Sequence, residues 1–151
     1  MNLDQLFEKL WQQYSSVNAQ AAEIHRLLES RGESLVNDHI ALRTFGLPEL
    51  GIDVIAAPFV KFGYVDCGSY DFAVKKLRAR HYEKKGYPRV FISELKVEEF
   101  SPQLQETVKI LASQVKNATA QDFSCCGRPW RNIDYKLYEA LRSESEYAAW
   151  L

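Results

Sequence analysis

The sequence has few cysteines and no long apolar run. Its 151 residues include three cysteines, Cys67, Cys125 and Cys126, which are too few and too odd in number for a disulfide framework. We therefore expect a reduced, cytoplasmic protein. No apolar stretch approaches the ~20 residues that cross a bilayer. The amphipathic N-terminus has early acidic residues, which argues against a secretory signal or a transit peptide.

The adjacent cysteines in SCCGRPW are the one local hint of redox or metal chemistry. They lack the x-x spacing with which two thiolates reach one zinc ion. We therefore interpret them as small buried or loop thiols. A glycine-rich phosphate loop, an H-E-x-x-H motif and a nucleophile elbow are also missing, so nucleotide-dependent chemistry and serine hydrolysis have no support.

The chain also lacks an excess of charge of either sign. Its 19 basic and 20 acidic residues give a net charge of −1, which implies no general attraction to nucleic acid or to an anionic membrane. We expect neither as a partner. What the chain does have is the composition of a folded globule, 46% hydrophobic and 13% aromatic. Its function must therefore rest on a local arrangement of side chains.

The length and the hydrophobic periodicity predict one domain over residues 1–151. We expect it to be helical over 1–32, to form a βαβββ core over 36–95 and to be helical again over 101–151. The predicted elements are helices at 3–14, 19–32 (capped by Asn18, ended by Gly32) and 51–62 (stopped by Gly63), strands at 37–45, 68–74, 75–83 and 89–95, a helix capped by Ser101, and a last helix near 134–150.

The predicted fold class is therefore α+β, a βαβββ half-barrel flanked by N- and C-terminal helices. Such a unit leaves its concave face open and needs a second copy or a partner to close it. The closing AAWL carries no helix-ending glycine or proline. We therefore expect the chain to be the N-terminal part of a longer protein.

The strand NDHIALRTF carries the most informative side chains. Side chains alternate along a strand, so His39, Ala41 and Arg43 share one face, whereas Ile40 and Leu42 take the other. Arg43 lies about 13 Å from His39 along the backbone, but its long side chain can lean back across the small Ala41. A histidine binds transition metals and an arginine clamps carboxylates, so the pair suits a metal-bound organic acid. Alternatively, Arg43 pairs with an acidic core neighbour and His39 is a satisfied buried histidine.

Two further side chains are weaker metal candidates. With His39, the side chains of His81 and Glu94 would form a two-histidine, one-carboxylate set for iron if all three pointed into the cup. Glu94 shares a strand face with apolar residues, a setting in which a carboxylate needs a partner. We favour the alternative that His81 and Glu94 lie at exposed strand ends. His25 is interpreted as a partly exposed helical histidine.

Four segments, NDHIALRTF, GYVDCGSYDFAVKKLRARHYE, RVFISEL and ESEYAAW, resemble the N-terminal half of the DUF1338 family. That family is associated with 2-oxoadipate dioxygenase/decarboxylase activity and is similar to the vicinal-oxygen-chelate fold. The resemblance implies a non-haem Fe(II) enzyme of lysine catabolism that converts 2-oxoadipate and O₂ to 2-hydroxyglutarate and CO₂. It further implies His39 as a metal ligand and Arg43 as a substrate-binding residue.

The resemblance also implies that the iron site in this chain is incomplete. The second histidine of the family lies in an N-H-F-T-like stretch beyond ESEYAAW and its glutamate further on, and this chain contains neither. His81 and Glu94 do not lie in those motifs and receive no role. Two alternatives follow: a non-catalytic module that binds small acids or forms a homodimer, and a glyoxalase-like isomerase or lyase. His39 also needs an acceptor for its second ring nitrogen. Asp38 or a backbone carbonyl could serve, and we favour a carbonyl or a bulge because an ideal strand would turn Asp38 away.

Overall fold

The computed structural model describes residues 2–115, 127–131 and 133–150, and the predicted loop role of Cys125 and Cys126 lies outside these residues. The helices are α1 (Leu3–Val17), α2 (Ala19–Glu29), α3 (Ile52–Lys61), α4 (Pro102–Ser113) and α5 (Tyr135–Glu144), the strands are β1 (His39–Phe45), β2 (Val65–Phe72), β3 (Leu77–Glu83) and β4 (Arg89–Leu95), and short 3₁₀ turns cover Ala73–Lys75 and Val97–Glu99. Within the described part of the chain, no helix is long and apolar enough to span a membrane.

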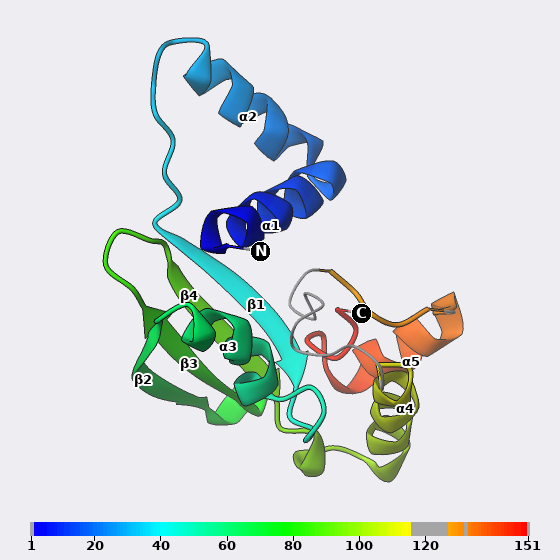
Figure 1. The fold of residues 1–151 in the computed structure, drawn as a ribbon. Coiled ribbons are helices and arrows are strands. Elements are labelled where there is room, and N and C mark those ends of the chain that lie inside the picture. The colour runs from blue at the N-terminus through cyan, green and yellow to red at the C-terminus, as the bar shows by residue number, and fades with distance from the viewer. Residues whose placement is uncertain (1, 116–126, 132, 151) are drawn as a thin grey trace.

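The four strands form one sheet in the order β1-β4-β3-β2. β1 and β4 run parallel, and the other two pairs are antiparallel. The element order between residues 39 and 95 is therefore βαβββ, which confirms the predicted α+β fold class. Helix α3 lies across one face of the sheet, and α4 and α5 gather beyond the end of β1 (Figure 1).

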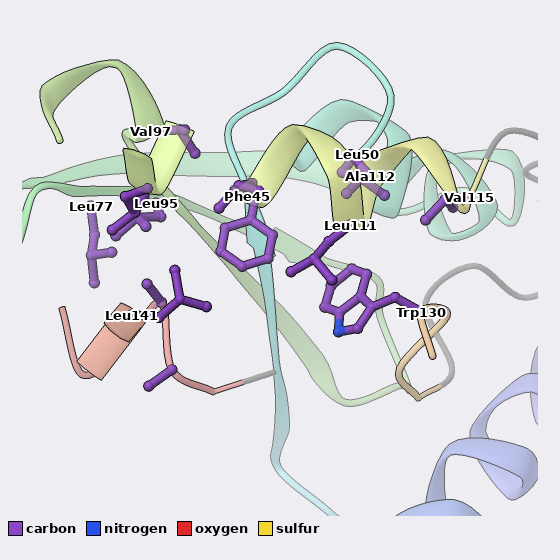
Figure 2. Packing of buried hydrophobic residues seen from close by; sticks show 14 residues of the cluster. Phe45, Leu50, Leu77, Leu95, Val97, Leu111, Ala112, Val115, Trp130 and Leu141 are labelled. Atoms are coloured by element: carbon purple, nitrogen blue, oxygen red, sulfur yellow. The ribbon is translucent and has the colours of Figure 1, made fainter. Parts of the chain in front are cut away.

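Two hydrophobic clusters hold the helices on the sheet. The first lies between α1, α3 and one sheet face, and its members include Leu6, Phe59 and Ile92. The second lies on the opposite face, at the end of the strands, where Phe45 and Leu95 pack against α4, α5 and Trp130 (Figure 2). Among the described residues, α4 and α5 cover only this end of that face, and the remainder is left open.

The chain after α5 departs from the predicted helix. α5 ends at Glu144 because Ser145 adopts extended backbone angles, φ −155° and ψ 119°. The Ser145 hydroxyl then accepts a hydrogen bond from the Ala148 N–H, and Ala148 and Ala149 pack into the second cluster. The last described residues therefore form a turn that lies against the sheet.

The predicted N-cap residues lie at the starts of their helices, but only one of the two makes a side-chain cap hydrogen bond. Ser101 caps α4 as expected, because its hydroxyl accepts from the Leu104 N–H. Asn18 starts α2, but its side-chain amide donates to the Tyr14 carbonyl and makes no cap bond. Gly32 lies in the turn after α2 with φ +82°, where a side chain would be strained.

Candidate functional site

The strand register places the small side chains of the open face together. Two rows cross the sheet side by side: Arg43–Ser93–Ala79–Tyr70 and Ala41–Phe91–His81–Gly68. Short side chains at Ala41 and Ser93 leave a hollow above the middle of β1 and β4. The lining of this hollow includes Ala41, Arg43, Phe91, Ser93, Tyr147 and Trp150.

Arg43 extends its guanidinium over aromatic rings instead of an acid. The guanidinium carbon lies 3.6 Å from the ring centroid of Trp150 and 5.3 Å from that of Tyr147. No carboxylate of a described residue pairs with it. The alternative that Arg43 pairs with an acidic core neighbour is therefore wrong for the part of the chain that the structure describes. Stacking covers the face of a guanidinium and leaves its N–H edges able to bind a planar acid.

Tyr147 fixes the turn after α5 to the two strands that carry the hollow. Its hydroxyl donates to the Ser93 carbonyl at 2.7 Å, accepts from the Thr44 N–H at 3.3 Å and lies 3.0 Å from the Ser93 hydroxyl. Burial raises the pKa of Tyr147, which keeps the phenol neutral and able to donate. Tyr147 and Trp150 were missed as site residues because ESEYAAW has the pattern of a continuing helix.

His39 lies at the start of β1 on the same strand face as Arg43. Its side chain is 62% exposed, so the alternative of a buried histidine is wrong. His39 lines a separate cleft between β1 and α1. Ala41 lies between His39 and Arg43 on the strand and lines both this cleft and the hollow at Arg43. The structure therefore places His39 and Arg43 along one edge strand, on either side of Ala41, as the alternation predicts.

Asp38 supplies the acceptor for the His39 ring. Its carboxylate Oδ1 lies 2.9 Å from His39 Nδ1, and this hydrogen bond lowers the pKa of Asp38. The expectation of a carbonyl or a bulge is wrong, because Asp38 lies in a bend just before β1 and is not bound by strand alternation. A carboxylate on Nδ1 selects the tautomer whose Nε2 lone pair is available to a metal ion.

Glu94 and His81 do not join His39. Glu94 is 6% exposed on the α3 face, where its carboxylate accepts the Ile52 N–H at 2.7 Å and pairs with Arg78. Its interpretation as an exposed strand end is therefore wrong. His81 is half-buried on the open face, with Nδ1 3.0 Å from the Tyr70 hydroxyl. Among the described residues, no three metal-ligating side chains gather in one place.

Comparison with known proteins identifies the family. The family model of 2-oxoadipate dioxygenase/decarboxylase matches residues 3–125. The chain belongs to this family. A curated 2-oxoadipate dioxygenase/decarboxylase of rice (Oryza sativa subsp. japonica), described as chloroplastic and amyloplastic, is 39% identical over 153 residues. The match covers 91% of this chain and 42% of the rice protein, so the chain spans less than half of that relative.

Solved structures share the fold. Rice hydroxyglutarate synthase, crystallised with 2-oxoadipate, is 33% identical with a TM-score of 0.87, and the match covers 97% of this chain and 52% of that one. A Shewanella frigidimarina structure, named as a hydrolase, is 46% identical with a TM-score of 0.90 and matches over 99% of this chain and 59% of its own. A glyoxalase superfamily protein of Ralstonia eutropha, 23% identical with a TM-score of 0.65, shares the fold alone. The vicinal-oxygen-chelate-like fold is thereby confirmed.

Proposed function

We propose that this chain forms the substrate-binding wall of a non-haem Fe(II) 2-oxo-acid dioxygenase/decarboxylase. Its substrates would be 2-oxoadipate and O₂, and its products 2-hydroxyglutarate and CO₂, as a step of lysine catabolism. Membership of the family supports the reaction, and the complex of the rice relative with 2-oxoadipate supports the substrate class. The cytoplasm is the compartment we propose.

The observation that carries the proposal is Arg43. An exposed guanidinium that lines a hollow and pairs with no described carboxylate can accept a ligand acid through two parallel N–H bonds. In our proposal Arg43 binds one carboxylate of the substrate and sets its orientation. The ring of Phe91, in the same hollow, would pack against the aliphatic carbons of the substrate.

The described residues alone do not fit an iron site. Non-haem iron is typically held by two histidines and a carboxylate. His39 lies beside the hollow, but no three metal-ligating side chains gather there or elsewhere among the described residues. We propose His39 as one ligand of the Fe(II), with Asp38 orienting its ring.

Calorimetric titration of the chain with 2-oxoadipate tests the proposal. We expect R43A to weaken binding at least tenfold, because a charge-assisted bidentate bond contributes roughly 1.5–3 kcal/mol. R26A is the matched control, since Arg26 pairs with Glu23 on α2 and has the same charge. Absence of binding by the wild-type chain, or equal loss in both variants, contradicts the proposal.

A second function, a non-catalytic module that binds small acids, is favoured because no three metal-ligating side chains gather among the described residues. Oxygen uptake separates the two functions. Uptake that requires both Fe(II) and 2-oxoadipate, and that H39A abolishes, supports the dioxygenase. Binding that depends on Arg43 without any uptake supports the module.

A further inference from the structure

We propose that Trp150 and Tyr147 are positioning residues that hold Arg43 in place for a substrate carboxylate. The turn after α5 would then be part of the substrate site. The proposal relies on the proposed function in one respect, that Arg43 is the group that binds the carboxylate. It is carried by three features of the described residues, namely the stack on Arg43, the anchoring of the turn and the lack of an ion pair between Arg43 and a described carboxylate.

The stack restrains a side chain that is otherwise very flexible. A free arginine side chain has many rotamers and loses that freedom when a ligand fixes it. Here the guanidinium carbon lies 3.6 Å above the Trp150 ring, within the range of a strong cation–π contact. Tyr147 presents a second ring at 5.3 Å. Part of the entropy cost is therefore met before the ligand arrives, which is how preorganisation raises affinity.

The turn that carries Trp150 is itself fixed next to Arg43. Tyr147 bonds to Thr44, the residue after Arg43, and to Ser93, which lies directly opposite Arg43 in the β1–β4 register. Ala148 is fully buried beside it. Although Trp150 is 69% exposed, its position is thus determined by the same two strands that position Arg43.

A purely structural role for the stack is a weaker explanation. An exposed indole at the surface buries little apolar area, so its removal costs the fold little. The stack instead faces a hollow whose lining includes Arg43, Ser93 and Phe91. The arrangement therefore favours a role in ligand binding over a role in stability.

A double-mutant cycle on 2-oxoadipate binding tests this inference. W150A should raise the dissociation constant about 3- to 30-fold, the range that corresponds to a cation–π contact, whereas W150F should keep most of the affinity. In an R43A background, W150A should have no further effect, since its target is gone. Y135A is the control, because Tyr135 is an aromatic residue of α5 that is 68% exposed and does not line the hollow. An equal effect of W150A with and without Arg43 overturns the inference.

A second readout does not need the proposed function. ¹⁵N relaxation of the Arg43 Nε–Hε group should show an ordered side chain in the wild type and a mobile one in W150A. If the wild type binds no 2-oxoadipate but this difference is found, the proposed function fails and the positioning stands. If Arg43 is equally mobile in both proteins, the positioning fails whatever the ligand.

Discussion

Glu94 carries a carboxylate and is nevertheless buried on the α3 face of the sheet. Alternation along β1 predicts that Arg43 and His39 share a face, and alternation along β4 predicts an apolar setting for Glu94. The reason for a carboxylate in that setting is the N–H of Ile52 at the start of α3, which is 42 residues away. No local pattern encodes a contact at that separation. The pairing of Asp38 with His39 is disfavoured by the predicted strand, which begins at residue 37, whereas β1 begins at His39 and leaves Asp38 in a bend.

We expect the loss of Glu94 to destabilise the fold. E94A should lower the free energy of unfolding by about 2–3 kcal/mol, mainly because the Ile52 N–H loses its acceptor in a buried place. Arg78 is half exposed and can be solvated by water, so its lost ion pair adds little. E98A is the control, since Glu98 also lies near Arg78 but is exposed, and its loss should cost under about 0.5 kcal/mol. Urea unfolding measures both variants, and equal losses would contradict this assignment.

Tyr64 predicts how stability changes at high pH. Burial, with a smaller contribution from Tyr87, raises the pKa of Tyr64 to about 12, and its hydroxyl donates to the Pro88 carbonyl at 2.7 Å. Since the usual tyrosine pKa is about 10, the folded state favours the neutral phenol. Its contribution to stability is fully present below pH ~10 and is lost as the pH rises toward ~12.

Urea unfolding across this alkaline range tests the prediction. The free energy of unfolding should fall with pH in the wild type, and Y64F should fall less steeply because it cannot ionise. Some slope should remain in Y64F, since burial also raises the pKa of Tyr82 and Tyr147. Y14F, which alters an exposed residue of α1, should keep the wild-type slope. Identical slopes in Y64F and Y14F would show that Tyr64 does not ionise on unfolding.

At the scale of elements, helices with strong sequence signals were predicted at the correct positions, whereas elements with weak signals have different bounds in the structure. The helix at α4 was found because it has a serine cap, a proline at its first position and a regular apolar stripe. β2 begins at Val65 instead of residue 68, since most of its side chains are exposed and its bounds depend on pairing with β3 across an irregularity near Asp66. The helix predicted to continue to residue 150 ends at Glu144, because the bonds of Tyr147 to the sheet outweigh helix propensity.

At the scale of the whole molecule, the prediction of a half-barrel with an open face is confirmed in outline. In the part of the chain that the structure describes, one sheet face is covered by α3, and the other is covered at the end reached by α4 and α5 (Figure 1). Sequence patterns could not predict which side chains line the hollow on the open face, because Tyr147 and Trp150 come from a turn about 100 residues after β1. The predictions of a single domain at the start of a longer chain and of a homodimer stay predictions.

Hydrogen exchange should be slow in the sheet and fast in the helical hairpin formed by α1 and α2, above all in α2. β4 lies between two strands, and its Val90, Ile92 and Leu95 side chains are fully buried, so we expect its amides to exchange most slowly. α2 has no buried residue, and its Ile24 and Leu27 are exposed, so its amides should exchange fastest among the helices.

Mass spectrometry of deuterium uptake at two protein concentrations separates the explanations for any protection of α2. Rapid exchange at both concentrations agrees with a hairpin that has little support from the rest of the chain. Protection that disappears on dilution would instead mean that a second copy covers Ile24 and Leu27, as in the homodimer. Protection equal to that of β4 at both concentrations would contradict the prediction, because the exposed face of α2 could not by itself hold its amides closed.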